Sequence, residues 1–175
     1  PVSGQALDGG GMRVTAAGLA MIKAFEGLTL EARRLPDGRH IIGHGHVETA
    51  REGARLSPEQ AEALLIWDLK PIEDALKTRV FSPLTQQQFD ALASFALNIG
   101  LVRFLESDVL RALNAGRPIE AAMALDGWRL ARTEDGLLTV DALVRRRAAE
   151  KALFLSENAS IAAPAARLQP EFDLR

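Results

Sequence analysis

The sequence predicts an α+β fold that is mainly α, in which a small β region comes early and a helical body follows. The helical body is predicted by segments after residue 57 whose apolar residues recur at helical spacing behind recognisable N-terminal caps. The β region is predicted by residues 28–47, which are rich in glycine and alternate locally between apolar and polar side chains. The length of 175 residues suggests one domain that can bury a core without cross-links.

The N-terminal part is expected to pass from a leader into a helix and then into strands. Residues 1–13 are mostly small or polar and rich in glycine, which predicts a flexible leader. They contain no basic segment followed by an apolar run, so no signal peptide is expected. Thr15 can cap a helix that Gly27 ends. The turn Pro36-Asp37-Gly38 then separates short strands, in a hairpin or a three-stranded sheet.

The helices of the body follow from their start signals. Capping boxes at Ser57-Pro58-Glu59-Gln60 and Thr85-Gln86-Gln87-Gln88 predict the first two. Pro71 should kink or split the first, because a proline inside a helix lacks the N–H that the helix needs. Three further helices are predicted to start at Ser107, Pro118 and Thr139.

The C-terminal residues have a different composition. Residues 158–175 are of low complexity and include Ala162-Ala163-Pro164-Ala165-Ala166, which predicts a linker or tail. Residues 14–157 are therefore the expected folded domain. No stretch reaches the roughly 18 uninterrupted apolar residues of a membrane-spanning helix, so none is expected.

Charge and cysteine content exclude some classes of function. The chain has 21 basic and 23 acidic residues and a net charge of −2, without the basic patch or stripe that nucleic-acid binding requires. It has no cysteine, which excludes disulfides and cysteine-ligated zinc. We expect no cofactor and no nucleic-acid partner.

The three histidines are the obvious candidates for a metal site. His40, His44 and His46 are separated by even numbers of residues and would share one face of a strand, where imidazoles can bind zinc or nickel. Gly43 and Gly45 interrupt that strand, and no carboxylate pair accompanies it. Structural or exposed histidines are therefore favoured, and no metal is predicted.

Other charged residues have a functional and a plain interpretation. Glu26, at a junction between helix and strand, could be a general acid with a raised pKa, or an ordinary residue at a helix end. Arg33-Arg34 and Arg145-Arg146-Arg147 could bind anions, but a solvated face is favoured for both.

Several motifs together resemble one family. Phe25-Glu26-Gly27-Leu28 followed by Ile42-Gly43-His44-Gly45-His46 closely resembles the phage-type lysozymes, or endolysins. The resemblance covers residues 14–157 and continues through residues 84–100 and 107–116, Trp128 and residues 143–150. It implies a small β lobe and a helical lobe, joined by the long helix from Ser57, with a cleft between them that binds peptidoglycan.

The resemblance also assigns roles to residues. Glu26 takes the position of the family's general acid. His46 and Asp68 take the positions of a buried ion pair, which gives His46 a structural role.

Two positions depart from the family pattern. The family has an aspartate or cysteine nine residues after its glutamate and a threonine six residues further on, where this chain has Leu35 and Ile41. Neither aliphatic side chain can stabilise an oxocarbenium-like centre or activate water. Asp37 and Glu31 are possible substitutes, but Asp37 belongs to a turn in which its side chain is expected to bond its own backbone. A degenerate muramidase is therefore predicted, and a lysozyme with residual or altered activity through Glu26 is the alternative.

A narrower resemblance suggests what such a domain does. Residues 33–39 resemble the corresponding loop of the muramidase-like domain of SpmX proteins, which are bacterial polar-morphogenesis proteins. In that family the lysozyme fold is a localisation and scaffolding module on the cytoplasmic side of the inner membrane, near a cell pole. It engages the polar organising protein PopZ, and membrane segments follow a proline-rich linker. The resemblance implies a PopZ-like partner or self-association, with peptidoglycan as a further possible partner, and membrane attachment only through segments absent from this chain.

Overall fold

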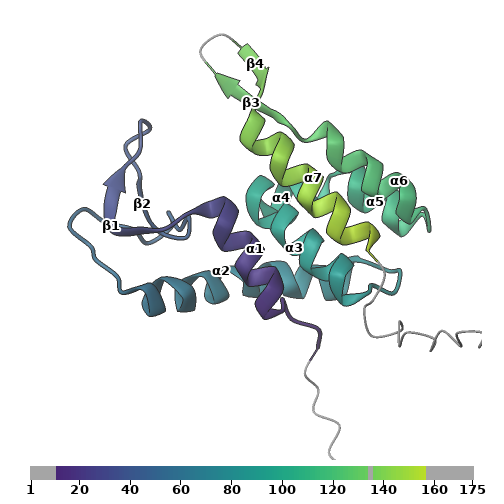
Figure 1. The fold of residues 1–175 in the computed structure, drawn as a ribbon, viewed down its shortest axis with the longest axis horizontal. Coiled ribbons are helices and arrows are strands. Elements are labelled where there is room, and N and C mark those ends of the chain that lie inside the picture. The colour runs from purple at the N-terminus through teal and green to yellow at the C-terminus, as the bar shows by residue number, and fades with distance from the viewer. Residues whose placement is uncertain (1–10, 134–135, 157–175) are drawn as a thin grey trace, which may run out of the picture.

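The computed structural model of the chain describes residues 11–133 and 136–156. It confirms an α+β fold that is mainly α, with a small lobe of two strands beside a larger helical lobe (Figure 1). In chain order the elements are α1 (Ala16–Glu26), β1 (Thr29–Arg34), β2 (His40–Gly43), α2 (Pro58–Arg79), α3 (Gln86–Ile99), α4 (Leu101–Leu105), α5 (Asp108–Asn114), α6 (Pro118–Ala124), the 3₁₀ turn η1 (Leu125–Gly127), β3 (Leu130–Thr133), β4 (Gly136–Thr139) and α7 (Asp141–Leu155).

The small lobe is an antiparallel hairpin. Strands β1 and β2 pair with Arg33 opposite Ile41 and Arg34 opposite His40. A single bridge between Glu31 and Arg55 adds the following loop to its edge, so the sheet is a two-stranded hairpin rather than three full strands. Helix α2 leads from this lobe along the base of the molecule into the helical lobe (Figure 1).

The core lies in the helical lobe, around α3. Phe89, Leu92 and Phe95 on α3 are almost completely buried, and Ile22 from α1 joins the same cluster. Helix α7 packs along α3, and Phe95 meets Phe104 of α4 edge to face. Because α1 contributes to this core, the helix that ends at Glu26 is anchored in the helical lobe.

The predicted start signals form as expected. Thr15 caps α1, and both capping boxes, at Ser57 and Thr85, are complete. Ser107 caps α5, and Pro118 begins α6. Each of the three capping hydroxyls at Ser57, Thr85 and Ser107 accepts a backbone N–H that the first turn of a helix leaves unpaired.

Pro71 does not split α2, contrary to one of the two predicted outcomes. The helix runs unbroken over 22 residues from Pro58 to Arg79. Pro71 and Trp67, whose carbonyl would have accepted the missing N–H, are both exposed. Water can therefore bond that carbonyl, so the proline costs less here than it would on a buried face.

The sequence predicts only helices after the first lobe, and this prediction is wrong in one place. Leu130–Thr133 and Gly136–Thr139 form a second antiparallel hairpin, which rises at the top of Figure 1. Thr139 therefore ends a strand, and α7 starts two residues later, at Asp141, behind Val140. Helix α4, directly after Gly100, was also not predicted.

Near the N-terminus the chain contacts the body earlier than predicted. Met12 packs against the core, and the Arg13 carbonyl accepts a hydrogen bond from Gln86. Residues 1–10 of the predicted leader and the predicted tail at 158–175 lie outside the described residues. Within residues 11–133 and 136–156, no helix combines the length and the apolar character needed to cross a bilayer.

Candidate active site at the junction of the lobes

Glu26 lies where three parts of the fold meet. It is the last residue of α1, which Gly27 ends with a φ of 73°. Its side chain is 18% exposed, and its Oε1 accepts a hydrogen bond from Arg146 Nη1 of α7 at 2.6 Å. Its Oε2 lies against the small lobe, 2.8 Å from the place that a Cβ on Gly45 would take. A side chain at position 45 would therefore have to displace the carboxylate.

Behind Arg146 lies a buried cluster of charges. Glu150 is fully buried and accepts hydrogen bonds from Ser94 Oγ at 2.7 Å and Arg146 Nε at 3.1 Å. Arg147 forms an ion pair with Glu150 at 2.7 Å and donates to Asn98 Oδ1 at 2.8 Å. A continuous path of polar contacts therefore runs from Glu26 through α7 to Asn98 on α3.

The prediction of a solvated face for residues 145–147 is therefore wrong for two of the three arginines. Arg145 is exposed, but Arg146 and Arg147 face α3 and are buried. The error has a physical cause. Polar side chains of α3 provide the partners that let charged residues replace apolar ones on the inner face of α7.

Burial shifts the pKa values of two of these groups. It raises the pKa of Glu150 above that of an ordinary glutamate, against the opposing effects of Arg147, Ser94 and Arg146. Burial also lowers the pKa of the Arg147 guanidinium, while Glu150 opposes that shift. Both directions follow because charged forms are costly away from water.

His46 and Asp68 are brought together, as the resemblance implied. His46 is 6% exposed, and its Nδ1 lies 2.8 and 2.9 Å from the two carboxylate oxygens of Asp68 on α2. The Thr49 N–H donates to Nε2, so in the neutral ring the proton is on Nδ1 and is donated to Asp68. Burial raises the pKa of Asp68, and the bond to His46 only partly offsets the shift. Both ring nitrogens of His46 are therefore taken by protein partners.

The other two histidines lie elsewhere. His44 Nδ1 contacts the Gly27 carbonyl at 2.6 Å and so ties the glycine turn to the end of α1. His40 pairs with Arg34 in the hairpin. Among residues 11–133 and 136–156, no three histidine, aspartate or glutamate side chains are grouped so that they could hold a metal ion.

Leu35 and Ile41 lie in the small lobe, both half-buried. The Leu35 N–H donates to the Arg39 carbonyl at 2.7 Å, and its carbonyl accepts from the Gly38 N–H, which closes the turn after β1. Ile41 is in β2 opposite Arg33. The two positions therefore present aliphatic groups on the lobe that faces the end of α1.

The possible substitutes are engaged in exposed contacts. Asp37 accepts from the Arg39 backbone N–H at 3.0 Å and from its Nε at 2.8 Å, and these bonds lower the pKa of Asp37. Glu31 pairs with Arg55 at 3.2 Å. Each carboxylate is thus paired with an arginine of its own lobe.

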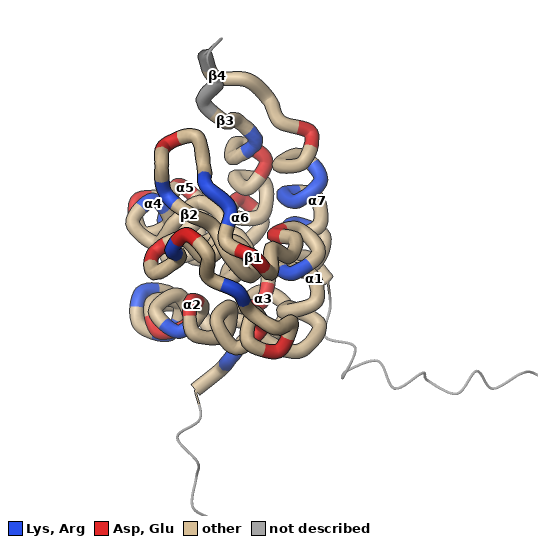
Figure 2. The backbone as a smooth tube through the Cα atoms, turned by 90° about the vertical axis from the view of Figure 1, so that its left-hand side faces the viewer, with Lys and Arg blue, Asp and Glu red and all other residues tan. Residues whose placement is uncertain are grey.

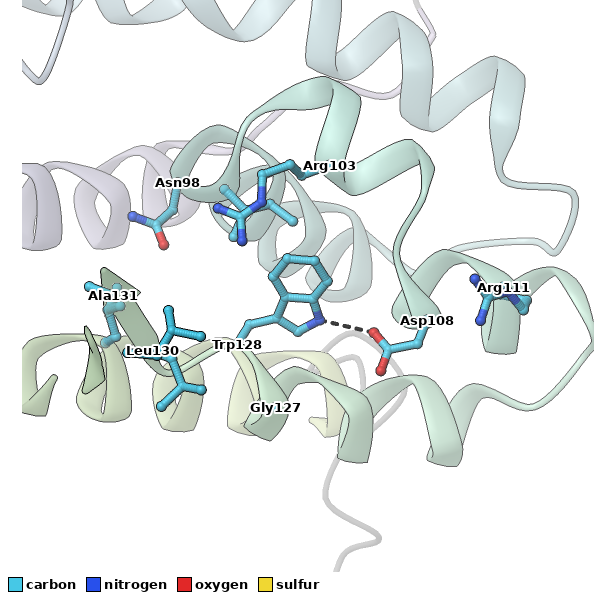
Figure 3. A pocket seen from close by; sticks show the side chains of 11 residues that line it. Asn98, Arg103, Asp108, Arg111, Gly127, Trp128, Leu130 and Ala131 are labelled. Carbon is cyan, nitrogen blue, oxygen red and sulfur yellow. Dashed lines mark hydrogen bonds between the residues drawn. The ribbon is translucent and has the colours of Figure 1, made fainter. Parts of the chain in front are cut away.

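The structure also has a cavity that the sequence did not predict. About 790 Å³ in volume, it lies between α3, α4, α5 and the second hairpin. Trp128 forms one wall of the cavity, and the Arg103 guanidinium lies over its indole ring (Figure 3). The Trp128 Nε1–H donates to Asp108 Oδ1 at 2.9 Å. Asn98 also lines this cavity, so the polar path from Glu26 ends at its wall. Trp128, one of only two tryptophans in the chain, was a sign in the sequence that could have pointed to this cavity.

Charge is distributed without a dominant sign. Acidic and basic positions are interspersed over most of the elements seen in Figure 2. The mixture agrees with the net charge of −2. A long-range field that attracts a polyanion is not expected from it.

Comparison with known proteins shows the family. Residues 23–150 match the family model described as Phage lysozyme. The chain belongs to the phage lysozyme family. An endolysin of Acyrthosiphon pisum secondary endosymbiont phage 1 is 38% identical over 83% of this chain and 99% of its own length. An endolysin of Bacillus phage PZA is 36% identical over 94% of this chain, which matches 64% of that longer protein.

A solved structure extends the likeness to the narrower group. The muramidase domain of SpmX from Asticaccaulis excentricus is 51% identical and superposes with a TM-score of 0.80, covering 83% of this chain and 99% of that one. Both resemblances found in the sequence are thereby confirmed, for the phage lysozyme family and for the SpmX muramidase domain as a neighbour. The roles assigned to Glu26, Leu35 and Ile41 stay predictions.

Proposed function

We propose that this member of the phage lysozyme family is a degenerate muramidase domain that serves as a protein-interaction module. One observation carries the proposal: Leu35 and Ile41 occupy the positions where the family resemblance puts an aspartate and a threonine. We assign residues 14–157 to the folded module, residues 158–175 to a linker, and residues 1–13 to a leader whose last two residues, Met12 and Arg13, contact the module.

The chemistry of glycoside cleavage explains why these two positions matter. One carboxyl group protonates the leaving oxygen, and a second group must stabilise the developing positive centre or activate water. Glu26 can supply only the first function. Loss of a general base alone costs about 100- to 10,000-fold in rate, and the arginine contacts of Asp37 and Glu31 favour structural roles for both.

The scaffolding part of the proposal is supported by the likeness to the SpmX muramidase domain. By that likeness we propose a PopZ-like polar organising protein, or a second copy of the domain, as the partner. We place the module on the cytoplasmic face of the inner membrane near a cell pole, attached through segments absent from this chain. Leu35 and Ile41 add apolar surface where a hydrolase needs polar groups, which suits contact with protein.

The alternative function is a peptidoglycan muramidase with residual or altered activity. It is favoured by the placement of Glu26, partly exposed at the junction of the lobes and bonded to Arg146. The similarity to two phage endolysins also supports peptidoglycan as the ligand in this alternative.

Peptidoglycan hydrolysis by the purified protein tests the proposal. We expect no hydrolysis by the wild type, and gain of activity in the double variant Leu35→Asp/Ile41→Thr. The same double variant carrying Glu26→Gln is the matched control and should be inactive. Hydrolysis by the wild type that Glu26→Gln abolishes would overturn the proposal in favour of the alternative.

A further inference from the structure

Glu26 is one of several partners that hold the Arg146 side chain. Its Nη1 donates to Glu26 at 2.6 Å. Its Nε donates to Glu150 at 3.1 Å, and its Nη2 donates to the Ser94 carbonyl at 3.1 Å and hydroxyl at 3.2 Å. The guanidinium is planar and rigid, so contacts along one edge decide where the other nitrogen points. The edge formed by Nε and Nη2 is fixed by Glu150 and Ser94, and Nη1 is thereby directed at Glu26.

The two carboxylates that share Arg146 differ in burial. Glu150 is 0% exposed, whereas the Glu26 side chain is 18% exposed and reaches the surface between the lobes. Glu150 is also held by Ser94 and Arg147. The inner carboxylate is therefore the fixed point, and the outer one is the group that the arginine holds in place.

Such a cluster is not explained by stability alone. A buried ion pair is often no more stabilising than apolar side chains of similar volume, because desolvation offsets the attraction between the charges. Arg147 Nη1 has no hydrogen-bond partner among the residues that the structure describes, which adds to the cost. A precise geometry for Arg146 is what this arrangement supplies and apolar packing does not.

We infer that Glu150 is a positioning residue, which orients Arg146 and through it holds the Glu26 carboxylate at the junction of the lobes. Glu150 does not touch Glu26, since Arg146 lies between them. The inference concerns geometry and does not depend on whether the domain hydrolyses glycan.

The first test measures hydrogen exchange of the Arg146 Nε–H by NMR in three proteins. In the wild type this proton is buried and bonded to Glu150 at 3.1 Å, with the Ser94 hydroxyl as a longer second acceptor at 3.3 Å, and we expect slow exchange. Glu150→Gln should speed its exchange by about tenfold or more, whereas Glu26→Gln should leave it nearly unchanged. Equal protection in wild type and Glu150→Gln, or loss of protection in Glu26→Gln alone, would overturn the inference.

The second test is a double-mutant cycle on the unfolding equilibrium. If Glu150 directs Arg146 at Glu26, Glu150→Gln already weakens that contact, so Glu26→Gln should cost less in the Glu150→Gln protein than in the wild type. The double variant Glu26→Gln/Glu150→Gln should therefore be destabilised by about tenfold less, in the unfolding equilibrium constant, than the product of the two single effects. Additive effects, or a combined loss larger than the product, would refute the inference.

Two controls guard this result. Asp90 of α3 is another buried carboxylate, but it bonds Thr15, which caps α1, and Gln86 at the start of α3. Glu26→Gln combined with Asp90→Asn should be additive within about twofold. If Glu150→Gln fails to fold, Ser94→Ala replaces it in the cycle and in the exchange measurement, because the Ser94 hydroxyl bonds both Glu150 and Arg146. Additivity there, with protection of the Arg146 Nε–H unchanged, would equally refute the inference.

Discussion

Replacing Glu26 by glutamine tests whether its carboxylate stabilises the fold or is held in place for catalysis. The amide keeps the shape of the side chain and an oxygen that can accept from Arg146 Nη1, now 2.6 Å from Glu26 Oε1. What it loses is the negative charge. A hydrogen bond to a charged group contributes about 1.5–3 kcal/mol, and a neutral one about 0.5–1.5 kcal/mol. Arg146 is 4% exposed, so solvent screens little of the difference.

We therefore expect Glu26→Gln to lower the free energy of unfolding by about 1–2 kcal/mol at neutral pH. For a domain of this size that corresponds to a fall in Tm of about 2–8 °C. Urea unfolding followed by circular dichroism measures it. Glu62→Gln is the control. Glu62 of α2 pairs with Lys23, which is on the same helix as Glu26, but the Glu62 side chain is 45% exposed, and exposed pairs contribute about 0–1 kcal/mol.

The opposite sign would refute this reasoning. A Glu26→Gln protein that is more stable than the wild type would show that the carboxylate is held at a cost to the fold. That cost is typical of sites selected for activity. It would favour the muramidase alternative over the scaffold, even before any hydrolysis is measured.

Two other perturbations address the small lobe. Gly45→Ala should destabilise the fold by about 1–3 kcal/mol, because the φ of Gly45 is 90° and the new Cβ would meet the Glu26 carboxylate. Gly53→Ala is the control and should cost less, because Gly53 has a similar φ of 77° but open space around it. Thermal unfolding of both variants measures the difference, and equal losses would contradict the prediction. The raised pKa of Asp68 means that the folded state holds its proton more tightly than the unfolded chain, so the stability it contributes is complete below about pH 3.8 and is lost as the pH rises through the folded pKa. The advantage of wild type over Asp68→Asn should therefore shrink in urea titrations as the pH rises above about 3.8, and an advantage that grows with pH there would show the pKa of Asp68 to be lowered instead.

Local signals in the sequence were enough for most helix starts. Ser57, Thr85 and Ser107 cap the helices that they were expected to cap, because capping depends on residues only three positions away. The second hairpin was missed because Leu137 and Leu138 form a short apolar run next to a helix, and period alone does not separate strand from helix in such runs.

The candidate site needed information from distant residues. Spacing and family resemblance identified Glu26, Leu35 and Ile41, but the partner of Glu26 is 120 positions away on α7. Arg146 and Arg147 were assigned to solvent because arginine is rarely buried without a partner. Their partners lie on α3, more than 45 positions earlier, where no local pattern connects them.

The contact between Glu26 and Arg146 has a mechanical consequence. It fixes the C-terminal end of α1 to the helical lobe, while Leu35 and Ile41 belong to the hairpin beyond Gly27. Any hinge between the lobes must then act at Gly27 and in α2, the two places where the chain passes between them. Opening or closing would move the hairpin against a stationary Glu26. The distance between Glu26 and the two aliphatic positions is therefore a variable that a bound partner could set, by holding one hinge angle out of many.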